Sequence, residues 1–244
     1  ISAMVGIDSR ATMDIDTTLR NYPLNCESAE QIVRQIADVE IDDKISFVIK
    51  KTEEIMEDSE YQGVRLSLDA YLDKTRIPLK IDISTGDVIT PCEISFSYQL
   101  MFENRTIPLL AYPPETVLAE KLETILSRGE ANTRLRDFYD VYILQREDFV
   151  VTPDALRYAL LATCRKRGHE DLLHTYASIL NEVRQSGAMR AQWMKYQTDF
   201  DYAAGITWDT VLDTVETLCM KTLDDHAFGD ELPQEESQFE MHLL

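Results

Sequence analysis

The chain has 244 residues, of which 44% are hydrophobic, and it carries a formal net charge of −20. This length allows one large domain or two smaller domains with a real core. No run of about 20 apolar residues is present and the chain start lacks a cleavage motif, so a membrane or secreted protein is not expected. The negative charge disfavours long-range attraction of nucleic acid, so any nucleotide site must use a local basic patch or bound cations.

The cysteine spacing and the chain start bear on the cellular context. The four cysteines are widely spaced and form no C-x-x-C pair, which predicts reduced thiols in a cytoplasmic protein rather than a disulfide framework or a zinc site. The chain begins at Ile1 inside an apolar stretch that is typical of the end of a helix. We therefore expect the natural N-terminus to lie upstream, so that the first domain is truncated.

The first half is predicted to mix strands with helices. Residues 13–19 alternate apolar and polar side chains, as a half-buried strand does. Ser28 and Gln31 have the spacing of a capping box, which predicts a helix that ends at about Glu40. Three more strands are predicted, joined by turn-like segments, and they cover residues 44–55, 63–72 and 77–84.

The second half is predicted to be helical. One helix begins after Pro113 and ends before Gly129, and Thr152 has the position of a helix cap. The other predicted helices cover residues 132–145, 170–185, 189–197 and 207–223. This order predicts an α+β protein in which a mixed sheet with flanking helices is followed by an α-helical C-terminal part. The predicted divisions are a sheet domain over 1–110, a helical domain over 111–223 and an acidic tail over 224–244.

Three aspartates are candidate metal ligands. Asp14 and Asp16 are two residues apart in a predicted strand, so their carboxylates share one face about 6–7 Å apart along the chain. Asp82 and Lys80 share the face of a second strand that lies opposite its isoleucines. If the two strands pair, the three carboxylates converge, and such a set suits a two-metal magnesium site. The alternative is a solvated strand face.

Charged residues in two predicted helices are candidates for the positive side of a site. Lys121 lies at the border of an apolar stripe, from which its amine either contacts a phosphate or reaches solvent. Asp137 and Asp140 lie among apolar residues, so they need partners if they are half buried. Local pairing with Arg134 and Arg136 at helical spacing is an adequate alternative.

Four short motifs occur in a characteristic order between residues 6 and 144. They are R-A-T-M-D-I-D at 10–16, K-I-D at 80–82, E-T-V-L-A-E-K at 115–121 and R-L-R-D-F-Y-D at 134–140. Together they resemble the motifs of the AbiEii/AbiGii toxin family of nucleotidyltransferases, within the DNA polymerase β-like superfamily. The family pattern has a lysine where this chain has Arg136, and often a basic residue where it has Pro78. The glycine-rich phosphate loop of the family is also missing.

The resemblance implies transfer of a nucleoside monophosphate from an NTP to an acceptor hydroxyl, with tRNA or another RNA as a possible acceptor and a cognate antitoxin as partner. It implies that Mg²⁺ is held by Asp14, Asp16 and Asp82, and that Asp82 also polarises or deprotonates the acceptor hydroxyl. It further implies that Asp137 and Asp140 order the site. The residues near the nucleotide would be Arg10, Thr12, Lys80, Lys121 and Arg136.

Three other functions are compatible with the residues. A metal-dependent nuclease could use the D-x-K pair of Asp42 and Lys44, although these residues lie in a predicted turn. A non-catalytic scaffold of the nucleotidyltransferase type would need neither the glycine loop nor a basic surface. A small-molecule nucleotidyltransferase would use the same metal chemistry on a different acceptor alcohol.

Overall fold

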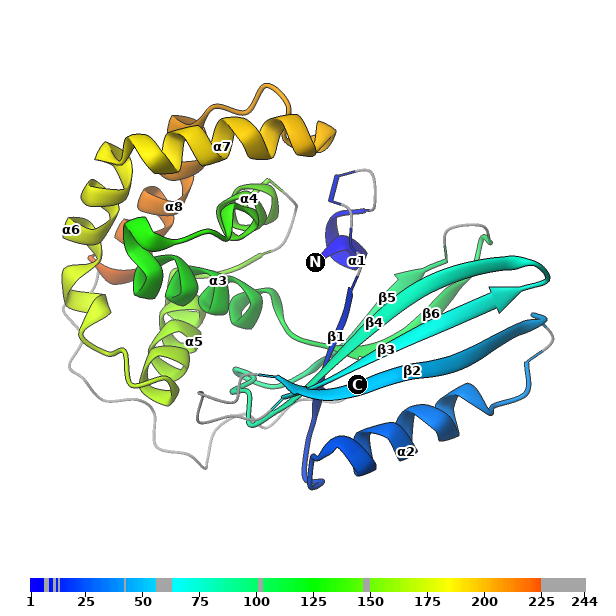
Figure 1. The fold of residues 1–244 in the computed structure, drawn as a ribbon. Helices are drawn as coiled ribbons and strands as arrows, with labels where there is room; N and C mark the ends of the chain where they lie inside the picture. Colours follow the sequence, from blue (N-terminus) through cyan, green and yellow to red (C-terminus); the bar gives the residue numbers. More distant parts are fainter. Residues whose placement is uncertain are drawn as a thin grey trace. The chain divides into compact units, whose positions relative to one another are not determined.

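The computed structural model describes residues 1–6, 9–10, 12, 14–41, 43–55, 63–100, 103–146 and 150–224. By internal contacts the chain divides into two compact units. The sheet unit is Ala11–Asp87, and the helical unit combines Ile1–Arg10 with Val88–Leu244. The predicted α+β class is confirmed (Figure 1). Among the described residues, no helix has both the length and the apolar character that crossing a membrane requires.

The sheet unit is a four-stranded mixed sheet with one helix. Its elements are β1 (Asp14–Leu19), α2 (Cys26–Ala37), β2 (Ile45–Ile55), β3 (Gly63–Leu72) and β4 (Thr75–Thr85). The strand order is β1-β4-β3-β2, with β1 parallel to β4 and the other neighbours antiparallel. All four strands were predicted, and their positions are confirmed within a few residues.

The start of helix α2 differs from the prediction. Asn25 is the N-cap, since its side chain accepts a hydrogen bond of 2.8 Å from the Ser28 amide, while the Ser28 hydroxyl accepts one of 3.0 Å from the Asn25 amide. The predicted capping box of Ser28 and Gln31 is therefore wrong. Asparagine is as good a cap as serine, and Asn25 begins the helix three residues earlier. The helix also ends at Ala37 rather than near Glu40.

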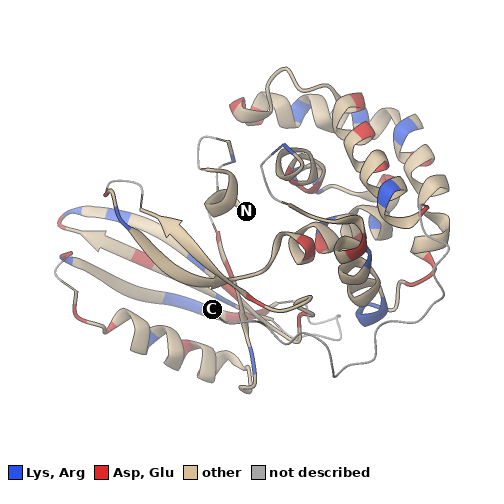
Figure 2. Cartoon of the chain, turned by 180° about the vertical axis from the view of Figure 1, so that it is seen from behind, with Lys and Arg blue, Asp and Glu red and all other residues tan. Residues whose placement is uncertain are grey.

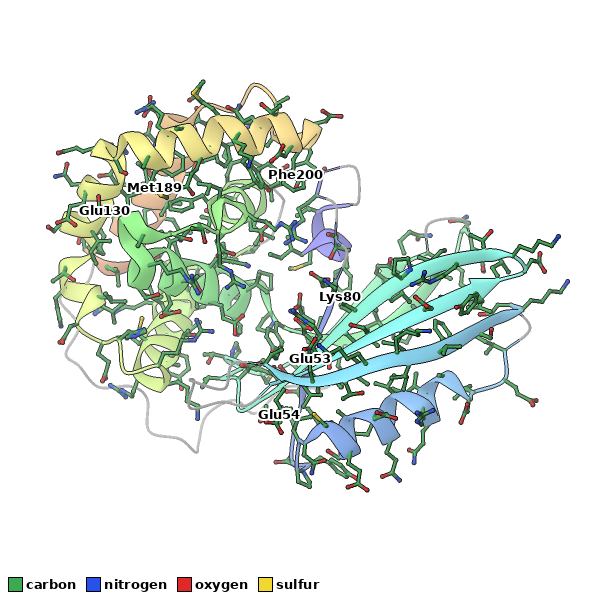
Figure 3. The ribbon with its side chains drawn as sticks, viewed as in Figure 1. Glu53, Glu54, Lys80, Glu130, Met189 and Phe200 are labelled. Atoms are coloured by element: carbon green, nitrogen blue, oxygen red, sulfur yellow. The ribbon has the colours of Figure 1, made fainter. Side chains whose placement is uncertain are left out.

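Helix α2 covers one face of the sheet and thereby identifies the other as the polar face. Alternate residues along β3 and one on β4 are buried against Ala29 and Val33 of α2, namely Val64, Leu66, Leu68 and Ile83. Because successive side chains of a strand point to opposite faces, Arg65 and Asp82 lie on the face away from α2. Figure 3 shows the same alternation on β2, where Glu53 and Glu54 point to opposite sides.

The helical unit contains the remaining elements. Its helices are α1 (Ser2–Val5), α3 (Pro114–Arg128), α4 (Leu135–Leu144), α5 (Pro153–Lys166), α6 (Leu172–Gln185), α7 (Gly187–Asp199) and α8 (Trp208–Leu223), with short 3₁₀ turns at Gly129–Ala131 and Asp201–Ala203. The predicted helices are confirmed, including the Thr152 cap, which accepts a hydrogen bond from the Ala155 amide. The hairpin of β5 (Ile94–Gln99) and β6 (Thr106–Ala111) was not predicted.

The N-terminal residues belong to the helical core. Val5 of α1 is buried in the same apolar cluster as Leu118, Leu122 and Phe138. The Tyr139 hydroxyl donates a hydrogen bond of 2.5 Å to the Ser9 carbonyl. These contacts place the following residue, Arg10, against helix α4. The unit boundaries near residues 10 and 87 consequently differ from the division after residue 110 that the order of elements predicts.

Candidate active site

The parallel pair β1–β4 brings two of the candidate aspartates together. Its register places Asp14 opposite Lys80 and Asp16 opposite Asp82. Further along the same pair, the hydroxyls of Thr18 and Ser84 are 2.9 Å apart, which shows that these two side chains share a face. Since Asp16 and Asp82 each lie two residues before them, their carboxylates share that face too.

Arg65 is the partner of Asp82, and sequence reasoning missed it. The Arg65 guanidinium donates two hydrogen bonds to the Asp82 carboxylate, at 2.7 Å from Nε and 2.6 Å from Nη2. This bidentate contact is the main reason why the pKa of Arg65 is raised. The negative charges of Asp82, Asp14 and Glu53 raise the Arg65 pKa further.

The position of Arg65 could have been found from the β3–β4 turn. Strand β3 ends at Leu72 and β4 begins at Thr75, so two residues connect them. A two-residue hairpin loop fixes the register of the whole pair. Arg65 and Asp82 each lie seven residues from the strand end at this turn, so the register places them opposite each other.

The charged row continues across the sheet to its edge. Glu53 on β2 lies opposite Arg65 in the β2–β3 register, so four strands contribute Asp16, Asp82, Arg65 and Glu53 at one level. The Glu53 carboxylate also accepts a hydrogen bond of 2.5 Å from Lys51. Asp16 is exposed and Asp14 is half-buried, so this face is open to a ligand.

The donor chemistry of this row fits a magnesium ion, because Mg²⁺ takes carboxylate oxygens together with phosphate oxygens and water. Within the described part of the chain, however, no group of three or more histidine, cysteine or acidic side chains is arranged to hold a metal. Both oxygens of Asp82 are bonded to Arg65 instead. The predicted convergence of Asp14, Asp16 and Asp82 is therefore incomplete in this conformation.

A second cluster of charges lies in the helical unit. Arg10 donates two hydrogen bonds to Asp140, at 3.0 Å from Nε and 3.2 Å from Nη2. Lys121 of α3 donates to Asp137 at 2.6 Å, and its Nζ is 3.4 Å from Asp140 Oδ2. The Asp140 side chain is fully buried, while Lys121 keeps 24% of its side chain exposed.

The electrostatics of this cluster follow from its burial. Burial alone would lower the pKa of Arg10, but the hydrogen bonds and charge of Asp140 outweigh it, so the Arg10 pKa is raised and the guanidinium stays charged. Among the described residues, the buried Asp137 Oδ2 atom of this cluster has no hydrogen-bond partner. An acceptor atom that is buried without a partner is costly, and a bound donor could satisfy it.

The local pairing considered for helix α4 is wrong. Asp140 bonds Arg10 and Lys121, and Asp137 bonds Lys121, rather than the arginines of their own helix. Arg136 instead lies over the Phe200 ring, 5.7 Å from its centroid. Lys121 also does not simply extend to solvent, because Asp137 holds its amine.

The remaining candidate residues are placed as follows. The Thr12 hydroxyl donates to the Asp14 carbonyl at 3.1 Å, immediately before β1. Lys80 is exposed on β4 opposite Asp14, on the sheet that Figure 3 shows with Lys80 labelled. Asp42, needed for the nuclease hypothesis, lies outside the described residues, as do residues 225–244 of the predicted tail.

Comparison with protein-family models identifies the same family that the four motifs resemble. A family model described as "Nucleotidyl transferase AbiEii toxin, Type IV TA system" matches residues 1–214. A crystal structure of an H. pylori protein assigned as a nucleotidyltransferase is similar, with 12% sequence identity and a TM-score of 0.39 over 86% of this chain and 79% of that one. A search of curated proteins found no match.

Proposed function

The chain belongs to the AbiEii family of nucleotidyl transferase toxins, and on this premise we propose that it moves a nucleoside monophosphate from a magnesium-bound NTP to an acceptor hydroxyl. The observation that carries the proposal is the β1–β4 register, which puts Asp16 beside Asp82 on the exposed face of the sheet. Asp14 lies two residues before Asp16 and shares this face. Three oxygen-rich side chains on adjacent parallel strands suit a metal–triphosphate complex.

In the proposed reaction, Asp14, Asp16 and Asp82 would hold Mg²⁺. When bound, Mg²⁺ neutralises charge on the triphosphate and lowers the pKa of the attacking hydroxyl. The acceptor oxygen attacks the α-phosphorus, the bond between the α-phosphorus and its bridging oxygen breaks, and pyrophosphate leaves. Asp82 accepts the proton of the acceptor hydroxyl, which requires that it first part from Arg65.

The proposed nucleotide-binding residues are assigned one by one from the family motifs. Lys80 lies beside Asp14 on the exposed face and would contact a phosphate. In the helical unit, the partly exposed Lys121 and the nearby Arg10 would contact phosphates, with Asp137 and Asp140 orienting their cationic groups. Thr12 and Arg136 complete the proposed set.

For the acceptor we propose RNA, with tRNA as the first molecule to test, because the family is one of toxins in type IV toxin–antitoxin systems. We also propose a cognate antitoxin as partner and the cytoplasm as location. Figure 2 shows Lys and Arg interspersed with Asp and Glu along the helices, so contacts with RNA would depend on local groups and on the bound metal. A small-molecule acceptor is the alternative outcome of the experiment below.

The test is transfer of label from α-³²P NTPs to total cellular RNA in the presence of Mg²⁺. Asp14→Ala is expected to lower the rate by about 10³-fold, because losing a ligand of the catalytic metal removes several kcal/mol of transition-state stabilisation. Asp38→Ala, an exposed carboxylate at the end of α2 in the same unit, is the matched control and should retain the rate. Equal incorporation by wild type and Asp14→Ala would reject the proposed metal role.

A further inference from the structure

The proposed reaction requires Asp82 to part from Arg65 but gives Arg65 itself no task. Both guanidinium contacts are short, at 2.7 and 2.6 Å, and they use both oxygens of the carboxylate. The Asp82 side chain is 18% exposed and that of Arg65 is 36% exposed. The pair is therefore partly shielded from water, yet a ligand from solvent can reach it. The same atoms of Asp82 are those that a metal would need.

We propose that Arg65 is a positioning residue that occupies Asp82 while no metal is bound and yields it when a divalent cation enters. The proposal rests on the proposed function, because it assumes that Asp82 is a metal ligand. Before metal arrives, Asp14, Asp16 and Asp82 would repel one another on one face, and the Arg65 charge relieves that repulsion from within the chain. A divalent cation between the same carboxylates relieves it more strongly and makes the arginine unnecessary.

Glu53 offers the released guanidinium a second partner. It lies opposite Arg65 on the neighbouring strand, on the side away from Asp82, and its charge acts on Arg65 in the present conformation. Glu53 is now paired with the exposed Lys51. If this pair separates, water can solvate the Lys51 amine equally well. Arg65 can therefore turn from Asp82 toward Glu53 by side-chain rotation, without a change in the sheet hydrogen bonds.

Two consequences distinguish this exchange from a purely structural ion pair. Removing Arg65 should make divalent cations bind more tightly, since the metal no longer competes with the guanidinium for Asp82. Removing Glu53 should make them bind more weakly, because the released guanidinium loses its alternative partner. A structural pair would predict no change, or weaker binding through loss of order, for Arg65.

The experiment measures Mn²⁺ binding to the full chain by electron paramagnetic resonance of the free ion. Arg65→Gln is expected to bind Mn²⁺ roughly tenfold more tightly than wild type, equivalent to about 1.4 kcal/mol. Arg65→Lys, which keeps the charge but loses the planar fork, should tighten binding by a smaller factor and guards against misfolding of the glutamine variant. The matched control is Arg76→Gln, because Arg76 lies on β4 on the same face and bonds Asp69 rather than Asp82.

The outcomes separate this inference from the proposed function. If Asp14→Ala abolishes Mn²⁺ binding but both Arg65 variants bind like wild type or more weakly, the exchange is wrong and the metal site stands. If wild type and Asp14→Ala bind Mn²⁺ equally, the metal site itself is wrong. Tighter binding in Arg65→Gln that disappears in Arg65→Gln/Asp82→Asn supports the exchange, whereas equal tightening in Arg76→Gln would reduce it to a general charge effect and overturn it.

Discussion

The two clusters of charged residues use the same chemical groups in different proportions. The helical cluster has two carboxylates, Asp137 and Asp140, and two cations, Arg10 and Lys121, and most of it is buried. On the sheet, the four carboxylates of Asp14, Asp16, Asp82 and Glu53 accompany three cations, Arg65, Lys80 and Lys51, on a more exposed face. The first cluster is balanced by its own residues, whereas the second needs another cation. Balance and burial, more than residue type, therefore indicate which cluster stabilises the fold and which one awaits a ligand.

The largest expected effect comes from breaking the buried cluster. Asp140→Ala would leave Arg10 without its carboxylate and would remove one contact of Lys121. Removing one partner of a buried ion pair costs about 3–5 kcal/mol, because the other charge stays desolvated. Urea denaturation monitored by circular dichroism should show this loss in the free energy of unfolding of the helical unit.

The contrast between the two clusters fails if a substitution in the sheet cluster lowers the free energy of unfolding as much as Asp140→Ala does. Asp16→Ala removes an exposed carboxylate from a crowded acidic face, so its free energy of unfolding should stay within about 0.5 kcal/mol of wild type. A loss of several kcal/mol in Asp16→Ala, or none in Asp140→Ala, would mean that burial does not separate the two clusters.

A smaller effect is expected for Lys121, which belongs to the buried cluster but reaches solvent. Lys121→Met keeps much of the side-chain volume and leaves Asp137 without its 2.6 Å donor, which should cost about 1–3 kcal/mol of stability. If Lys121 also contacts the triphosphate, the KM for NTP should rise in the same variant.

Arg10→Met tests the other cation proposed to contact the phosphates, since it removes the deeper cation of the same cluster. Loss of stability in both variants, with a raised KM only in Lys121→Met, would assign the phosphate contact to the lysine. An unchanged KM in Lys121→Met would restrict the lysine to a structural role.

The sequence predicts the sheet cluster better than the helical one, for a physical reason. Strand alternation and a two-residue turn are local features, and the turn fixes the register that sets Arg65 against Asp82. The partner of Asp140 is Arg10, 130 residues away, and nothing periodic connects these positions. Local spacing favoured Arg136 instead, because it cannot show that the N-terminal segment packs on helix α4.

Sheet pairing of β1 with β4 lies between these cases. Alternation predicts each strand, but 55 residues separate the end of β1 from the start of β4, so the sequence does not determine that the two strands are neighbours. The sequence therefore predicts that Asp16 lies beside Asp82 only on the condition that the two strands pair. The hairpin β5–β6 was missed although I-S-F-S-Y-Q alternates apolar and polar residues. The segment that joins its two strands, L-M-F-E-N-R, contains neither glycine nor proline and so gives no strong turn signal.

A modest thermal shift is expected on metal binding, and it tests the excess negative charge of the sheet cluster directly. A ligand that binds only the folded state at ten times its Kd adds about 1.4 kcal/mol of stability, which raises the Tm of a chain of this size by about 3–5 °C. Mg²⁺ should therefore raise the Tm of wild type, and EDTA should reverse the shift. Asp14→Ala should lose the response, while Lys121→Met should keep it, because Lys121 is not one of the proposed magnesium ligands. A Mg²⁺ response that survives Asp14→Ala but disappears in Lys121→Met would place the cation in the helical unit and reverse the assignment of the two clusters.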